Sequence, residues 1–167
     1  SELQSALQAA VEEKPQSFLA SENTEWQGMW AGSDESGKGD FFGPLVVAAV
    51  IVDETTAAKL QAAGVKDCKQ LSDKKVLLLE EVIKENVVDS AVLELKPHIY
   101  NMRYNQVKAE GDNLNQLLGY GHVAALSQVL ERHQACKGAL IDQFTQSKAV
   151  LNSLKAKFPA MTFKQQP

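Results

Sequence analysis

The chain has 167 residues, of which 44% are hydrophobic and 23% charged, and its formal net charge is −4. This composition is ordinary for one compact globular domain. The acidic balance excludes a protein that grips nucleic acid along its whole surface, so any nucleic-acid binding must be local. The longest apolar run is shorter than the roughly 20 residues that a membrane-spanning helix needs.

The first 28 residues differ in pattern from the rest. Leu3, Leu7 and Val11 recur every four residues and predict a short amphipathic helix over 2–13, which Pro15 ends. A polar stretch without periodicity follows and indicates a linker. We therefore expect a helix and linker over 1–28 and one domain over 29–167.

From residue 30 onward, strands and helices alternate. The apolar, β-branched run after Gly43 predicts a fully buried strand. Asp53 and Ser72 suit helix N-caps, and Gly64 suits a helix end. The predicted strands are 30–35, 44–52, 87–95, 139–144 and one beginning at 161–163, and the predicted helices are 54–63, 73–85, 100–107, 113–132 and 147–157.

The connections between these elements predict a mixed sheet. Only a short turn separates the first two strands, which should pair antiparallel, whereas the later strands alternate with helices and should run parallel. The fold class is therefore α/β. Gly119 and Gly121 in the long helix indicate close packing against a neighbour. The apolar face expected for the helix over 73–85 consists of Val76, Leu77, Leu79, Val82 and Ile83.

Three acids stand where predicted strands end. Asp34 and Glu35 lie where a strand meets a glycine-rich turn, and Asp142 follows a short apolar run. Neighbouring residues of a strand point to opposite faces, so Asp34 and Glu35 can share one site only where the strand ends or bulges, which Gly37 permits. Clustered carboxylates suit Mg²⁺, although Asp34 and Glu35 alone also fit an ordinary turn.

Glycines and lysines near these acids are candidates for substrate contacts. Gly37, Lys38 and Gly39 leave backbone groups open to a ligand, but they also fit a tight turn with a solvated lysine. Lys66 and Lys69 lie in a loop that can contact phosphate or simply be solvated. We interpret His122 as a helix-packing histidine, and Tyr100, Tyr104 and Tyr120 as packing residues rather than base-stacking ones.

Four segments, in order, resemble the type 2 ribonucleases H, and the ribonuclease HIII subtype most. They are 34–40 with 42–44, 65–73, 113–118 with His122, and 140–144. The resemblance implies a ribonuclease H-like fold, with a central mixed sheet flanked by helices. It also implies an endonuclease that cuts the RNA strand of RNA–DNA hybrids and leaves 5′-phosphate and 3′-hydroxyl ends.

The resemblance assigns roles to the candidate residues. Asp34, Glu35 and Asp142 would hold Mg²⁺ or Mn²⁺ for two-metal catalysis, and the Gly37–Gly39 turn would recognise the 2′-hydroxyl group of the RNA. Cys68 stands where the family has serine, which weakens a hydrogen bond to phosphate there. The family also has a fourth acid and a substrate-binding domain beyond the ends of this sequence, so both ends look abbreviated and we expect weak or no activity.

Two further readings stay open. The chain could be a module that binds hybrid duplexes without cleaving them, or another phosphoryl-transfer enzyme on the same fold. Nothing at the N-terminus resembles a signal peptide, and the distant cysteines Cys68 and Cys136 have no metal-ligand spacing, so we expect a cytoplasmic protein. We also expect a monomer that has no membrane contact.

Overall fold

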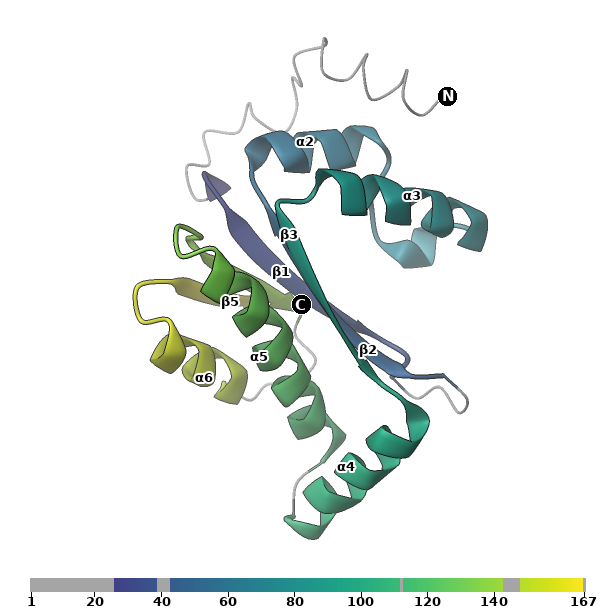
Figure 1. The fold of residues 1–167 in the computed structure, drawn as a ribbon, viewed down its shortest axis with the longest axis vertical. Coiled ribbons are helices and arrows are strands. Elements are labelled where there is room, and N and C mark those ends of the chain that lie inside the picture. Colours follow the sequence, from purple (N-terminus) through teal and green to yellow (C-terminus); the bar gives the residue numbers. More distant parts are fainter. Residues whose placement is uncertain (1–25, 39–42, 112, 143–147, 167) are drawn as a thin grey trace. The chain divides into compact units, whose positions relative to one another are not determined.

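The computed structural model describes residues 26–38, 43–111, 113–142 and 148–166. They include a five-stranded sheet in the order β3-β2-β1-β4-β5 (Figure 1). The strands are β1 (Trp30–Ser36), β2 (Leu45–Val52), β3 (Asp89–Leu95), β4 (Gly138–Asp142) and β5 (Thr162–Gln166). The helices are α2 (Glu54–Ala62), α3 (Asp73–Asn86), α4 (Pro97–Ala109), α5 (Leu114–Arg132) and α6 (Ala149–Lys157), with the 3-10 turn η2 (Cys68–Gln70). Each element predicted from residue 30 onward is present, with its ends displaced by a few residues.

The chain divides into two compact units, which are described separately. The first consists of residues 1–28 and 52–88 and contains α2, η2 and α3. The second consists of 29–51 and 89–167 and contains the sheet with α4, α5 and α6. The helix predicted over 2–13 lies outside the described residues, so the domain boundary at residue 28 stays a prediction.

Parallel pairing joins β1, β4 and β5. Ser33 of β1 lies opposite Ile141 of β4, and Gly138 of β4 lies opposite Thr162 of β5. The chain passes from β4 to β5 through α6, as the crossover between parallel strands requires. The predicted parallel direction of the fourth and fifth strands is confirmed.

The parallel crossover predicted between β2 and β3 is wrong, because β3 pairs antiparallel with β2. Leu95 lies opposite Leu45, and Asp89 lies opposite Ile51. Two helices, α2 and α3, separate β2 from β3, so the chain returns to the sheet beside the residue where it left. The alternation of strands and helices predicts a parallel crossover only when the helical connection carries the chain to the opposite end of the sheet.

The burial of β2 also differs from the prediction of a fully buried strand. Leu45, Val47, Ala49 and Ile51 are at most 2% exposed, whereas the residues between them keep intermediate exposure. β-branched residues suit half-buried and fully buried strands alike, so the apolar run could not distinguish the two. One face of β2 therefore belongs to the core.

Helix α5 packs across the sheet, in contact with β1 and β3, and α4 and α6 pack against it (Figure 1). Its core side chains Leu118, Leu126 and Leu130 are completely buried. A Cβ atom added to Gly121 would lie 2.9 Å from Val47 Cγ2, which confirms the predicted close packing at that glycine. In the described part of the chain, no helix has the length and apolar character needed to cross a membrane.

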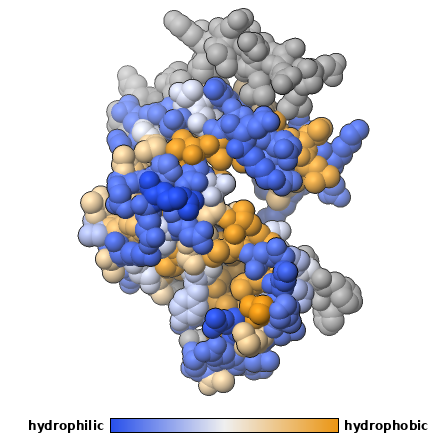
Figure 2. Space-filling model, in the orientation of Figure 1, coloured by the Kyte–Doolittle hydropathy of each residue, from blue (hydrophilic) through white to orange (hydrophobic). Residues whose placement is uncertain are grey.

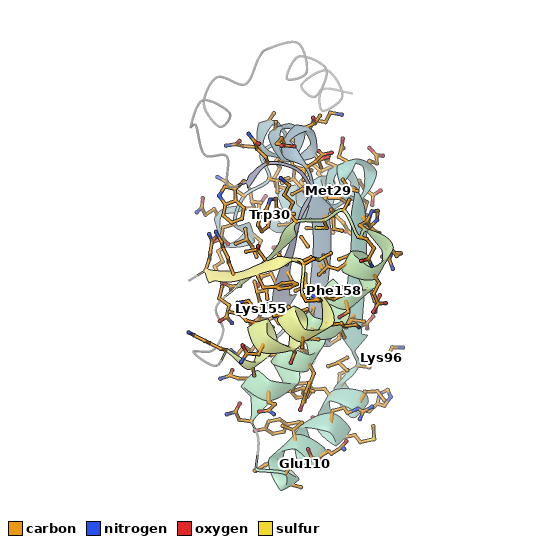
Figure 3. The ribbon with its side chains drawn as sticks, turned by 90° about the vertical axis from the view of Figure 1, so that its left-hand side faces the viewer. Met29, Trp30, Lys96, Glu110, Lys155 and Phe158 are labelled. Carbon is orange, nitrogen blue, oxygen red and sulfur yellow. The ribbon has the colours of Figure 1, made fainter. Side chains whose placement is uncertain are left out.

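Helix α6 closes the core beside β5. Phe158 lies at the C-terminal end of α6 (Figure 3). Its ring packs against that of Phe163, with 6.4 Å between ring centroids. Lys157 forms an ion pair of 2.7 Å with Glu131 of α5. Helices α5 and α6 are thereby linked both through the core and at the surface.

The first unit shows the predicted caps. The Asp53 carboxylate accepts a hydrogen bond from the Thr56 amide, and this bond lowers the pKa of Asp53. Gly64 has φ +91°, and the amides of Gly64 and Val65 donate to the carbonyls of Gln61 and Leu60, which is a Schellman motif.

The apolar face predicted for α3 is partly wrong. Leu79 and Val82 are buried, but Val76 and Leu77 are 37% and 65% exposed. Figure 2 shows hydrophobic residues on the surface of α3. Three consecutive leucines, at 77–79, leave the position of the buried face ambiguous in the sequence, because a helical repeat of apolar residues can start at any one of them.

Candidate metal centre

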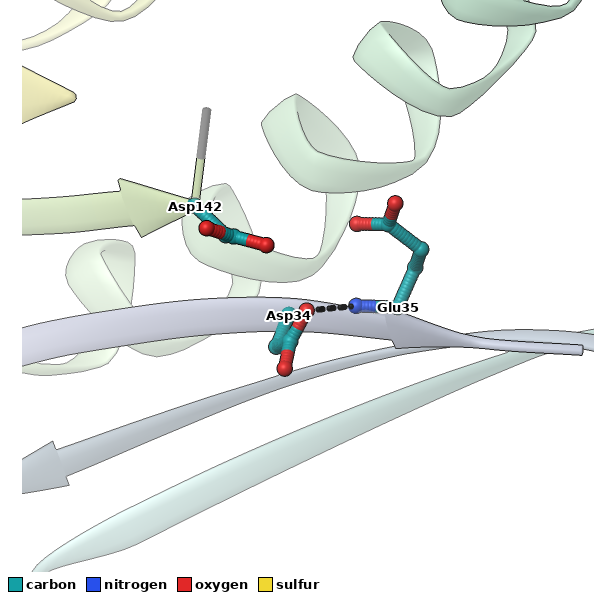
Figure 4. A group of neighbouring side chains, drawn as sticks. All are labelled: Asp34, Glu35 and Asp142. Atoms are coloured by element: carbon teal, nitrogen blue, oxygen red, sulfur yellow. Dashed lines mark hydrogen bonds between the residues drawn. The ribbon is translucent and has the colours of Figure 1, made fainter. Parts of the chain in front are cut away.

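Three carboxylates converge at one end of the sheet. Asp34 and Glu35 lie near the end of β1, and Asp142 is the last residue of β4. Each offers an oxygen atom, and these three oxygens all lie within 4.8 Å of one another (Figure 4). The structure therefore brings together the three acids that the sequence singles out.

The register of two parallel strands explains this convergence. Ser33 lies opposite Ile141, so the next residues along the strands, Asp34 and Asp142, meet at the same edge of the sheet. The C-terminal ends of parallel strands share that edge, where polar side chains gain access to solvent. Asp34 and Asp142 are both exposed.

Glu35 reaches the same cluster from the opposite face of β1. Its side chain is only 10% exposed, and its backbone amide donates a 2.7 Å hydrogen bond to Asp34 Oδ1 (Figure 4). The extra methylene of glutamate provides the reach that an aspartate at this position would lack. Neighbouring residues such as Asp34 and Glu35 can share one site only where a strand ends or bulges, and here they do so near the end of β1.

A buried histidine holds Glu35. His122 Nε2 lies 3.0 Å from Glu35 Oε2, and His122 Nδ1 lies 2.8 Å from Ser33 Oγ. The histidine belongs to α5 and is completely buried, in agreement with its interpretation as a packing residue, but its contact with the acids was missed. The available signal was the spacing of Ser33 and Glu35, which places both side chains on one face of the strand.

The glycine-rich turn follows the acids directly. Gly37 has φ +84°, and a Cβ atom there would overlap the carbonyl oxygen of Pro44. Only glycine fits this backbone without displacing the start of the next strand. Lys38 is exposed at the turn, and Gly39 lies outside the described residues.

The other predicted substrate contacts belong to the first unit. Lys66 precedes η2 and Lys69 lies within it, and both are exposed. The Asp67 carboxylate accepts a 2.9 Å hydrogen bond from the Lys69 amide. Cys68 is an exposed free thiol. Phosphate contacts from Lys66 and Lys69 stay a prediction.

The three tyrosines differ in packing and exposure. Tyr100 and Tyr104 stack on each other in α4, with ring centroids 5.9 Å apart and planes inclined by 4°. Burial raises the pKa of the Tyr100 hydroxyl. Tyr120 is 57% exposed. The packing interpretation therefore fits Tyr100 and Tyr104 better than Tyr120.

The chemistry of the donor set fits a hard divalent cation. Carboxylate oxygens are the preferred protein ligands of Mg²⁺ and Mn²⁺, and sites for these ions retain water and take oxygens from a substrate. Three carboxylates at this separation repel one another unless a cation lies among them. Two of the three are exposed, which leaves room for water and phosphate.

Comparison with known proteins shows that most of the chain is similar to ribonucleases. The model of the family described as Ribonuclease HII matches residues 31–166. Among curated proteins, the ribonuclease HIII of Protochlamydia amoebophila is 44% identical over 126 residues, covering 75% of this chain and 40% of that protein. The ribonuclease HIII of Bacillus cereus is 38% identical over 117 residues, covering 69% of this chain and 36% of that protein. The chain thus spans about two fifths of the length of these relatives.

Solved structures give the same match at the level of the fold. A crystal structure of Bst-RNase HIII in complex with Mn²⁺ has a TM-score of 0.69 and 29% identity, covering 93% of this chain and 49% of that one. The ribonuclease H2 of Pyrococcus horikoshii has a TM-score of 0.67 and 25% identity, covering 83% of this chain and 62% of that one. The mixed sheet flanked by helices is therefore the predicted ribonuclease H-like fold.

Proposed function

Because this chain belongs to the ribonuclease HII family, we propose that it contributes the metal-binding core of an endonuclease that hydrolyses the RNA strand of RNA–DNA hybrids. The observation that carries the proposal is the convergence of Asp34, Glu35 and Asp142 within 4.8 Å at the end of β1 and β4. That a structural relative was solved with Mn²⁺ supports a divalent-metal requirement.

The three acids would serve as metal ligands. Two Mg²⁺ or Mn²⁺ ions about 3.5–4 Å apart can activate water and stabilise the leaving oxygen of a phosphodiester, giving 5′-phosphate and 3′-hydroxyl ends. Asp34 and Asp142 present exposed oxygens to this position, and Glu35 approaches it from the buried face of β1.

Cleavage of a labelled hybrid tests the proposal. The chain is incubated with an RNA–DNA hybrid or an all-DNA duplex in Mg²⁺ or Mn²⁺, beside Asp142→Asn and the matched control Asp73→Asn, which changes an exposed acid at the start of α3. In line with the weak activity expected from the sequence, we expect slow cutting of the hybrid alone, reduced at least about 100-fold by Asp142→Asn and unchanged by Asp73→Asn. Retention of the hybrid without cleavage would assign a binding module instead.

The glycine turn would recognise the ribose. Gly37 holds the chain in a left-handed conformation two residues after Glu35, and the backbone groups of Gly37 and Lys38 are the candidates for contact with the ribose. A 2′-hydroxyl contact there would distinguish RNA from DNA.

A pair of glycines provides a matched test of the turn. Gly37 and Gly111 both have positive φ, but a Cβ atom would meet another atom within 4 Å only at Gly37. Both Gly→Ala variants should lose about 1–2 kcal/mol through backbone strain, and Gly37→Ala should lose more stability and also hybrid cleavage. Equal cleavage by the two variants, assayed below their melting temperatures, would contradict a role for this turn.

A further inference from the structure

We infer that His122 is a positioning residue for the metal centre, which fixes the Glu35 carboxylate and is itself oriented by Ser33. This inference rests on the proposed function, because it assigns a supporting contact to one of the three proposed ligands. The contacts are 3.0 Å between His122 Nε2 and Glu35 Oε2, and 2.8 Å between Ser33 Oγ and His122 Nδ1.

The alternation of β1 makes this arrangement possible. Ser33 and Glu35 are two residues apart, so their side chains lie on the same face of the strand, which is the face that α5 covers. The imidazole of His122 bridges them from α5. Asp34 points to the other face and receives its hydrogen bond from the backbone of Glu35 instead.

Hydrogen-bond chemistry fixes the direction of the contact with Glu35, and for a neutral imidazole it then fixes that of the contact with Ser33. A carboxylate only accepts, so Nε2 carries the proton and donates to Glu35. In that tautomer Nδ1 is an acceptor, and the Ser33 hydroxyl donates to it. Both ring nitrogens of a completely buried histidine are thereby satisfied.

The contact with His122 restricts Glu35, whose side chain has more rotatable bonds than those of Asp34 and Asp142. Glutamate has one more rotatable bond than aspartate, so an unsupported Glu35 would lose more rotamer entropy on binding a metal than Asp34 or Asp142. The bond from His122 engages Oε2 and limits the rotation of the Glu35 carboxylate. Groups that support metal ligands in this way typically change metal affinity by about 10–100-fold when they are removed.

A packing role and a positioning role can be separated by two variants of similar size. In His122→Gln the amide nitrogen takes the place of Nε2 and keeps the donor to Glu35. In His122→Asn the amide group of the shorter side chain takes the position of Nδ1. This variant keeps a hydrogen-bond partner for Ser33 and loses the donor to Glu35. Both variants disturb the packing of α5, but only the second releases Glu35.

The readout is Mn²⁺ binding by the whole 167-residue chain, measured by electron paramagnetic resonance of free Mn²⁺ at a temperature where circular dichroism shows each variant folded. We expect the dissociation constant of His122→Asn to be at least about 10-fold larger than that of the unmodified chain. The dissociation constant of His122→Gln should lie within about threefold of it. Ser33→Ala should weaken binding by a smaller factor than His122→Asn.

Equal dissociation constants for the unmodified chain and His122→Asn would overturn the positioning role while leaving the metal centre intact. Failure of the unmodified chain to bind Mn²⁺ would overturn the inference and the proposed function together. In the metal-free chain, nitrogen NMR of the imidazole should show the proton on Nε2, and a proton on Nδ1 alone would also overturn the inference.

Discussion

Glu35 and Asp89 each bond to a histidine near α5, but they differ in their other neighbours. Glu35 contacts His122 beside two further acids, Asp34 and Asp142, and within the described ranges no lysine or arginine forms an ion pair with any of the three. Asp89 contacts His133 and also receives two hydrogen bonds, of 2.7 and 3.1 Å, from Arg132.

The difference separates an acid that is paired within the fold from one that we propose as a metal ligand. The Arg132 guanidinium lowers the pKa of Asp89 through its hydrogen bonds, and Asp89 in turn raises the pKa of Arg132, so each stabilises the charged form of the other within the fold. Among the residues that the structure describes, no lysine or arginine pairs with the carboxylates around Glu35, which fits the metal-binding role that we propose for them. A histidine contact alone therefore does not identify the role of an acid, whereas the surrounding charges do.

The largest expected effect is on metal-dependent stability at the acid cluster. Mn²⁺ at 100 times its dissociation constant should stabilise the unmodified chain by about 2.7 kcal/mol, and Asp142→Asn should lose most of that gain. Without metal, Asp142→Asn should be no less stable than the unmodified chain, because one repulsive charge is removed. Thermal unfolding with and without Mn²⁺ measures both quantities.

The matched control for this experiment is Asp89→Asn, which should retain the Mn²⁺ gain. If Asp89→Asn lost the gain, or if Asp142→Asn kept it, the two acids would not have the separate roles assigned to them.

A smaller effect is expected at the ion pair itself. Asp89→Asn should lower the free energy of unfolding by about 1 kcal/mol at pH 7, because the pair has bidentate geometry but the Arg132 side chain is 49% exposed and screened by solvent. Urea unfolding measures this difference.

The pH dependence of that difference follows from the lowered pKa of Asp89. The contribution of Asp89 is fully present above the pKa of an unfolded aspartate, about 3.9, and is lost as pH falls through the lower folded value. The unmodified chain and Asp89→Asn should therefore converge in stability in acid. A difference in the free energy of unfolding that grew as the pH fell would contradict the lowered pKa of Asp89 in the folded chain.

The smallest effect is expected at the exposed pair between α5 and α6. Glu131 and Lys157 are 2.7 Å apart, but their side chains are 55% and 47% exposed. Glu131→Gln should change the free energy of unfolding by less than about 0.5 kcal/mol, and less still in 1 M salt. An effect as large as that of Asp89→Asn would show that exposure does not explain the difference between the two pairs.

Local sequence signals predicted most of the elements and the acid cluster. The run after Gly43 indicated β2, capping residues marked the ends of α2 and α3, and Asp142 followed a strand, so its place at the sheet edge could be inferred. These features depend on neighbours in sequence.

The features that the sequence did not predict depend on distant contacts. The role of His122 requires residues 87 and 89 positions away, and no pattern along α5 distinguishes a histidine that packs from one that also bonds to Glu35. The antiparallel direction of β3 depends on where the α2 and α3 segment returns to the sheet. The exposed side of α3 was ambiguous because apolar residues are consecutive there.

The pairing of Ile51 with Asp89 makes β2 and β3 a hairpin whose loop is the whole segment 52–88. Closing a loop of that length costs about 2 kcal/mol more in chain entropy than closing a four-residue turn. Replacing the segment with a short turn would leave the strand pairing and the acid cluster in one continuous unit. The pairing of β2 with β3 therefore does not require the two helices, and the substrate contacts predicted for Lys66 and Lys69 lie on a segment that can change in sequence without altering the register of the sheet.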